Sequence, residues 1–162
     1  MKFTFKGLKL TIDCEGDSVL EMDAESFHFQ RMEKIEEIEI INAENVTTIG
    51  DNFLSWCRRL EKIDLSPLCN VTTIGDWFLG CCTALRQLDL STLCNVTRIG
   101  KAFLAGCDGL TQLDLSPLSN ATTIGDRFLY GCHELKQLDG SPLRLDGSPL
   151  LSKWCAHTEP TN

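Results

Sequence analysis

The sequence contains no long apolar run and has less positive than negative charge. No segment reaches the ~20 apolar residues that a membrane-spanning helix needs, and lysines interrupt the N-terminal stretch MKFTFKGLKLTID before an apolar signal-peptide core can form. Acidic residues outnumber basic ones by 23 to 15, and the net charge of −8 disfavours nucleic acid and anionic membranes as partners. We therefore expect a cytoplasmic protein that binds neither nucleic acid nor membrane, with exposure at the cell surface left open.

Catalytic and metal-binding motifs are missing as well. The nine cysteines form no C-x-x-C pair, and their spacings do not match a zinc site. The three histidines, His28, His133 and His157, share no motif. No paired carboxylate, phosphate-binding loop or serine elbow stands out. We expect no catalytic, cofactor-binding or metal-binding residues, and therefore a protein that is not an enzyme and uses no cofactor.

What the sequence does have is an internal repeat of 25 residues. The dipeptide Ile-Gly recurs at this interval, and each copy is followed by Phe-Leu, a cysteine and a leucine block. The four Ile-Gly copies lie at 49–50, 74–75, 99–100 and 124–125, and the cysteines are Cys57, Cys82, Cys107 and Cys132. A degenerate copy with Ile35, Ile38 and Ile40 precedes them. Terminal repeats are expected to be atypical, because one of their faces meets water.

Each copy predicts one supersecondary unit. Residues 62–66 alternate polar and apolar side chains, which is the period of a β-strand. Residues 51–59 place apolar side chains at helical spacing, with Asp51 in position to cap a short helix. Residues 46–49 are β-branched and predict a second short strand. The fold class is therefore α/β: a solenoid of about five repeats of 25 residues, with a parallel sheet on the concave face and short helices on the outer side.

The pattern L-x-x-L-x-L, Val-Thr-x-Ile-Gly and Phe-Leu-x-Gly-Cys-x-x-Leu resembles the BspA-like leucine-rich repeats, also called the Treponema pallidum type. The residues that carry the resemblance are Val71, Thr72, Ile74, Gly75, Phe78, Cys82, Leu85, Leu88 and Leu90, with their equivalents one period away. The resemblance covers about residues 46–143 and the degenerate copy before them. It implies a leucine-rich-repeat fold. Because members of that family are commonly cell-surface adhesion or interaction proteins, it also implies protein binding.

The repeat divides the chain into four parts. Residues 1–20 contain two alternating apolar runs separated by Gly7, which predicts an N-terminal strand or hairpin cap. Residues 21–45 hold the degenerate repeat, and residues 46–144 hold four regular leucine-rich repeats. Residues 145–162 lose the pattern and predict an irregular C-terminal cap or tail.

Two columns of the repeat have a structural explanation. The four periodic cysteines lie on the apolar face, where free cysteine behaves as a small hydrophobic residue, so we expect buried, reduced thiols. Cys81 falls outside this column, and we expect it to be partly exposed. The Asn-x-Thr sequences at Asn45, Asn70, Asn95 and Asn120 match the glycosylation acceptor pattern, but glycans ~5 Å apart on stacked repeats would clash. We expect instead a ladder of asparagines that hydrogen-bonds the turn backbone.

Three outward-facing columns of the predicted strands form the candidate protein-binding surface. They are Lys62, Gln87, Gln112 and Gln137; Asp64, Asp89, Asp114 and Asp139; and Ser66, Ser91 and Ser116. Aspartate is a poor strand former, and like charges one strand apart repel by about 1 kcal/mol in water. Two interpretations stay open. The aspartates form an acidic stripe that binds a basic partner, or neighbouring Gln and Ser side chains hydrogen-bond them.

Trp56 and Trp77, in adjacent repeats, predict a second patch on the helix side, either used in an interface or packed between helices. The preferred function is a protein-binding module, a recognition or scaffold domain whose concave sheet binds another protein with a basic patch. The alternatives are a structural subunit of a larger assembly and a surface-adhesin-type repeat protein. The oligomeric state stays open.

Overall fold

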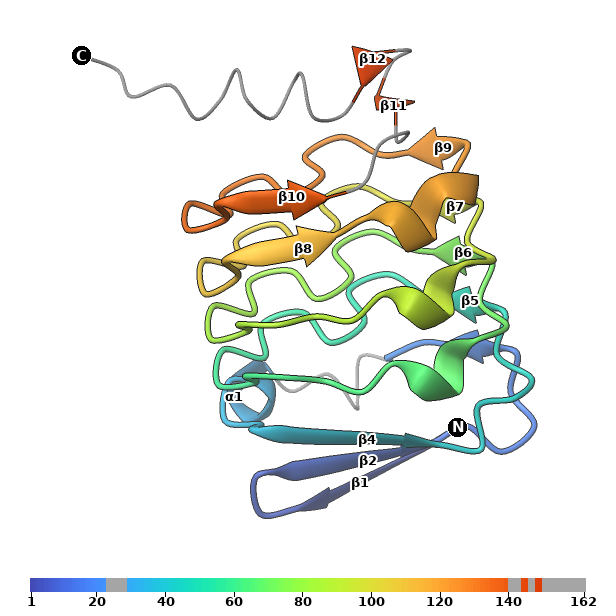
Figure 1. The fold of residues 1–162 in the computed structure, drawn as a ribbon. Coiled ribbons are helices and arrows are strands. Elements are labelled where there is room, and N and C mark those ends of the chain that lie inside the picture. The colour runs from blue at the N-terminus through green and yellow to red at the C-terminus, as the bar shows by residue number, and fades with distance from the viewer. Residues whose placement is uncertain (23–28, 140–143, 146–147, 150–162) are drawn as a thin grey trace.

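The computed structural model describes residues 1–22, 29–139, 144–145 and 148–149. The chain forms a β-solenoid in which each 25-residue repeat makes one turn, and successive turns stack on one another (Figure 1). The solenoid and its parallel sheets agree with the architecture predicted from the repeat. Within the described ranges, no helix is long and apolar enough to cross a membrane.

One side of the solenoid is a parallel sheet of two-residue strands. The sheet order is β3 (Val19–Leu20), β5 (Thr48–Ile49), β6 (Thr73–Ile74), β7 (Arg98–Ile99) and β9 (Thr123–Ile124). The register steps by one repeat at each pairing, so that Ile49 lies beside Ile74 and Ile74 beside Ile99. The second short strand predicted for residues 46–49 is therefore confirmed at its last two residues.

The glycine that follows each of these isoleucines lies where two turns touch. A Cβ added to Gly100 would lie 2.5 Å from the carbonyl carbon of Gly75, which is closer than two non-bonded carbon atoms can approach. A Cβ on Gly125 would meet the carbonyl carbon of Gly100 at the same distance. The Ile-Gly dipeptide thus combines a core side chain with a residue whose missing side chain allows the turns to stack.

The opposite side carries the segments that begin with the leucine block. There β2 (Lys9–Asp13) pairs in parallel with β4 (Glu37–Ile41), and β8 (Gln112–Asp114) pairs in parallel with β10 (Gln137–Asp139). Residues 62–65 and 87–90 run between β4 and β8 in the same direction (Figure 1), but they form no β-strand, so the strand predicted for residues 62–66 is wrong in that repeat. We call the exposed side of these segments the strand face, defined by positions 62, 64 and 66 and their equivalents in the other repeats.

A short 3-10 helix follows each of three strand-face segments. These helices are η1 (Ser66–Leu68), η2 (Ser91–Leu93) and η3 (Ser116–Asn120). Pro67 and Pro117 lie in the first turns of η1 and η3, where a fixed φ helps and no N–H is needed. The third residue of each helix is a buried leucine, which anchors the corner to the core.

The helix predicted over residues 51–59 is wrong. The segment is a run of turns with alternating left-handed residues, with φ of 58° at Asn52 and 57° at Leu54. This alternation points backbone N–H groups toward the neighbouring turns, and Asn52 donates to the carbonyl of Asp76 at 2.7 Å. The Asp51 carboxylate, expected to cap a helix, instead accepts the backbone N–H of Asp76 at 2.7 Å. Hydrogen bonds between turns therefore replace those within a helix.

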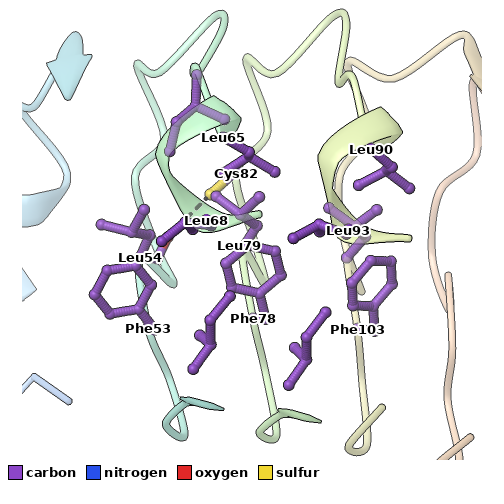
Figure 2. Packing of buried hydrophobic residues seen from close by; sticks show 14 of the residues in the cluster. Phe53, Leu54, Leu65, Leu68, Phe78, Leu79, Cys82, Leu90, Leu93 and Phe103 are labelled. Atoms are coloured by element: carbon purple, nitrogen blue, oxygen red, sulfur yellow. Dashed lines mark hydrogen bonds between the residues drawn. The ribbon is translucent and has the colours of Figure 1, made fainter. Parts of the chain in front are cut away.

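The core contains a row of phenylalanines, one from each regular repeat. Figure 2 shows Phe53, Phe78 and Phe103 side by side on adjacent turns, with ring centroids 6.4 Å and 5.8 Å apart. Phe128 continues the row at 5.0 Å from Phe103. All four rings are buried. Burial of each ring contributes about 1.5–3 kcal/mol, and stacking adds about 0.5–1.5 kcal/mol per pair.

The N-terminal end of the stack is closed by a hairpin. β1 (Lys2–Lys6) and β2 pair antiparallel around a turn with Gly7 at φ 63°, and Leu10 and Ile12 of β2 are fully buried. α1 (Phe29–Met32) lies in the turn before β4. Near the other end, β11 (Arg144–Leu145) pairs antiparallel with β12 (Ser148–Pro149). Most of the irregular C-terminal segment predicted for residues 145–162 lies outside the described residues.

Candidate protein-binding surface

The strand face brings the three predicted polar columns together. All their members are exposed: Lys62, Gln87, Gln112 and Gln137; Asp64, Asp89, Asp114 and Asp139; and Ser66, Ser91 and Ser116. They alternate with buried side chains such as Ile63 and Leu65, which hold the segment on the core. Because successive turns stack in register, each column is a ladder with one residue per turn.

The backbone fixes each aspartate of the ladder. One carboxylate oxygen, Oδ1, of Asp64, Asp89 and Asp114 accepts the N–H of the serine two residues later, at 2.8 Å in every case. This local turn is one for which aspartate is favoured, and it explains a poor strand former at the end of a strand segment. At Asp114, β8 therefore ends and η3 begins at this hydrogen bond, and at Asp64 and Asp89 the same bond leads into η1 and η2.

These hydrogen bonds also stabilise the charged form of the carboxylates. Bonds from the Ser91 backbone and side chain hold the pKa of Asp89 below its ordinary 3.8, and the Ser66 bonds lower the pKa of Asp64 in the same way. The pKa of Asp114 is lowered by the side chain and then the backbone of Ser116. The three carboxylates are therefore ionised at neutral pH.

No cation neutralises these three aspartates among the described residues. The turn before Asp64 differs. There Glu37 and Glu39 occupy the positions of Lys62 and Asp64, and the Lys9 ammonium of the capping hairpin lies 2.8 Å from the Glu37 carboxylate and 3.1 Å from that of Glu39. Charge on the strand face is thus paired within the chain at the hairpin end, whereas Asp64, Asp89 and Asp114 have no counter-ion in the part of the chain that the structure describes. At the upper end, the Gln137 amide donates to Asp139 at 2.8 Å.

Both interpretations of the aspartate column thus have a partial basis. The aspartates do accept internal hydrogen bonds, from the backbone N–H and the side chain of the serine two residues later at Asp64, Asp89 and Asp114, and from a Gln side chain at Asp139. Since a carboxylate has about four acceptor sites, the serine donors leave acceptor capacity on each exposed aspartate. The column is an internal turn device that remains able to bind an outside donor.

The predicted asparagine ladder is confirmed at Asn70, Asn95 and Asn120. The side-chain amide nitrogens of Asn70, Asn95 and Asn120 each donate to a backbone carbonyl of the preceding turn, at 2.8, 3.0 and 2.8 Å. The threonines two residues later do the same; for example, Thr97 donates to the carbonyl of Thr72 at 3.3 Å. The amide nitrogen that glycosylation would modify is therefore engaged in stacking the turns.

The periodic cysteines are buried, as predicted, and all four are free thiols. The thiols of Cys82, Cys107 and Cys132 each donate to a carbonyl of the preceding turn, at 3.2, 3.2 and 3.1 Å. Burial raises the pKa of Cys132 to about 11 and that of Cys107 further still. We therefore expect these thiols to be structural and to react slowly in the folded protein. Cys81 is half-buried, in line with its expected partial exposure.

Two exposed cysteines were not identified as candidates from the sequence. Cys69 and Cys94 follow η1 and η2, and both are free and exposed. The signal was available, because each precedes a ladder asparagine in a column whose other members are the polar residues Glu44 and Ser119.

The two tryptophans pack against their own chain. The Arg58 guanidinium lies 4.9 Å above the Trp56 ring. The Trp77 ring covers Gly80, where a Cβ would come within 2.9 Å of it. Both tryptophans are half-buried, whereas Tyr130 is exposed. They lie on the turn segment that replaces the predicted helix, so the packing between helices considered from the sequence does not occur.

Comparison with known proteins agrees with this architecture. The family model described as "BspA type Leucine rich repeat region (6 copies)" matches residues 22–142. The chain belongs to the BspA-type leucine-rich repeat family. The matched region begins in the degenerate repeat, ends at residue 142 within the last regular repeat, and includes the strand-face aspartate of every regular repeat. No curated protein and no solved structure matched this leucine-rich repeat chain.

Proposed function

We propose that this BspA-type repeat chain is a protein-binding module, a recognition or scaffold domain that binds a basic segment of another protein on its strand face. The observation that carries the proposal is the ladder of Asp64, Asp89 and Asp114. These three exposed carboxylates lie one turn apart, are fixed by backbone hydrogen bonds, and have no internal counter-ion among the described residues. The cytoplasmic location and the lack of catalysis expected from the sequence belong to the same proposal.

The physical argument is one of preorganisation. Three like charges held about 5 Å apart repel one another, and a partner that brings lysine or arginine side chains relieves this repulsion. Because the carboxylates are already oriented, binding them costs little side-chain entropy. The glutamines and serines beside them supply neutral donors and acceptors for a partner backbone. Such a surface favours fast, salt-sensitive association with basic segments.

Mapping a basic peptide onto the chain tests this surface. Amide chemical shifts of the labelled protein are followed while unlabelled decalysine is added at low salt. The proposal predicts that the largest changes fall at residues 62–66, 87–91 and 112–116. Changes concentrated on the turn segment around Trp56 and Trp77, or spread evenly over the exposed acidic residues, would contradict it.

A further inference from the structure

Cys69 and Cys94 occupy the same position in adjacent turns. Each directly follows a 3-10 helix, and their backbone angles are nearly the same: φ −65° and ψ −16° at Cys69, φ −67° and ψ −14° at Cys94. Both are exposed free thiols, whereas the other six described cysteines are buried or half-buried. The column holds Glu44 in the turn before and Ser119 in the turn after. Within the described part of the chain, the two thiols are therefore the exposed pair.

Hydrogen bonds hold the two positions in register. The Asn95 amide donates to the carbonyl of Cys69 at 3.0 Å, and the Thr92 hydroxyl donates to the carbonyl of Leu65 at 3.1 Å. Stacked parallel turns lie about 4.8 Å apart, within the Cα separation of about 4.4–6.8 Å that a disulfide accepts. At this general spacing, the stacked turns would place the two cysteines at bridging distance.

We propose that Cys69 and Cys94 form a reversible dithiol site that reacts with a low-molecular-weight disulfide. The thiolate of one cysteine attacks a sulfur of that disulfide, which forms a mixed disulfide and releases one small thiolate. The thiolate of the second cysteine then attacks the protein sulfur of the mixed disulfide and releases the other small thiolate. The two protein thiols lose two protons and two electrons, and the small disulfide is reduced to two thiols.

The pairing gives this site a property that isolated surface thiols lack. A single exposed cysteine stops at the mixed disulfide, whereas the neighbouring turn supplies a resolving thiol here. The resulting bridge would link two consecutive turns where η1 and η2 end. A small dithiol reverses the reaction by the same exchange chemistry.

Peptide mapping after oxidation tests the proposal. The protein is treated with oxidised glutathione, its remaining thiols are alkylated, and it is digested with trypsin at a pH that suppresses exchange. The expected product is peptide 63–86 joined by a disulfide to peptide 87–98, which contain Cys69 and Cys94. Cys69→Ser and Cys94→Ser should each lose this product and retain one glutathione on the remaining cysteine. Ser119 occupies the equivalent position, so the fold accepts serine there.

A trivalent arsenical measures proximity independently of oxidation. Native wild-type protein should bind one equivalent of phenylarsine oxide, and neither single variant should bind it with comparable affinity. Two glutathione adducts per chain with no linked peptide would overturn the proposal. The proposal would also be overturned if the link persisted in Cys69→Ser. The bridge would then come from Cys81 or Cys82, which lie in the same peptide 63–86.

Discussion

Asp89 accepts the backbone N–H of Ser91 at 2.8 Å, and this one contact joins the strand face to the corner of the solenoid. The same contact recurs between Asp64 and Ser66 and between Asp114 and Ser116. Asp89, which the sequence alone presents as a surface charge, therefore also stabilises the fold. The structural and the binding role of Asp89 can be separated, because they depend on different properties of the side chain.

Asp89→Ala removes both the charge and the acceptor, whereas Asp89→Asn removes the charge and keeps an acceptor oxygen. We expect Asp89→Ala to lower the free energy of unfolding by about 1 kcal/mol, as the loss of one hydrogen bond does. Asp89→Asn should lower it less, because it also relieves repulsion from Asp64. Urea unfolding of both variants measures the difference. Equal destabilisation by the two substitutions would mean that the charge, not the acceptor, matters for the turn.

The lowered pKa values of the ladder predict acid sensitivity. A carboxyl whose pKa is lower in the folded than in the unfolded chain adds stability above its ordinary value of 3.8, and this stability is lost as the pH falls through the folded-state value. The free energy of unfolding should therefore decrease as the pH falls below about 4. The variant Asp64→Asn/Asp89→Asn/Asp114→Asn should show a weaker decrease. Superimposable pH profiles for the variant and the wild type would refute this assignment.

Ser55 gives a stability prediction of the opposite sign. Its side chain is buried, and within the described part of the chain its hydroxyl has no hydrogen-bond partner. Ser55→Ala should stabilise the protein by about 1 kcal/mol, because it removes an unsatisfied polar group. The equivalent position in the repeat after next is Ala105, which is also buried.

Thr92→Val is the matched control for Ser55→Ala. It preserves the shape of the side chain but removes the 3.1 Å hydrogen bond from the Thr92 hydroxyl to the carbonyl of Leu65, which keeps only the N–H of Leu68 as a donor among the described residues, so it should destabilise by about 1 kcal/mol. Thermal unfolding of both variants checks the pair. Destabilisation by Ser55→Ala would show that its hydroxyl is satisfied, for example by a buried water.

Most of the architecture is predictable from the sequence, because the repeat shows which residues occupy equivalent positions in successive turns. The 25-residue period places the isoleucines, phenylalanines and cysteines in columns, and their apolar character predicts burial. The turn segment at residues 51–59 was not predictable in the same way. Its apolar spacing fits a helix equally well, and the hydrogen bonds that decide against a helix join residues in different turns, such as Asn52 and Asp76.

The candidate surface was predictable in position and only partly in chemistry. Alternation along residues 62–66 identifies which side chains face outward. The backbone bond to Asp64 needs the chain to turn immediately after Leu65, and the sequence signal for that turn is the Asp-x-Ser-Pro order. The alternating pattern predicts a strand through the same residues. Local turn chemistry therefore overrides the strand that alternation alone predicts.

Thiol labelling separates the buried from the exposed cysteines. The experiment uses protein carrying Cys155→Ser, because Cys155 lies outside the described residues. In this protein, Cys69 and Cys94 should react rapidly with an aromatic disulfide reagent under native conditions, and Cys81 more slowly. Cys82, Cys107 and Cys132 should stay unreactive until denaturant is added, because burial both shields them and raises their pKa values. Mass spectrometry of the labelled peptides identifies each site. Rapid native labelling of the periodic cysteines would contradict the packing of the core.

The affinity of two charge-matched triple variants for decalysine tests the central claim, that the strand-face carboxylates, and not the overall charge of the chain, bind basic partners. One variant carries Asp64→Asn, Asp89→Asn and Asp114→Asn. The other carries Glu15→Gln, Asp108→Asn and Asp126→Asn, at exposed positions outside the strand face. Fluorescence anisotropy at low and high salt should show at least about tenfold weaker binding and a smaller salt dependence for the first variant. The second should retain wild-type affinity within about twofold on the same electrostatic reasoning. Equal losses in the two variants would contradict the claim.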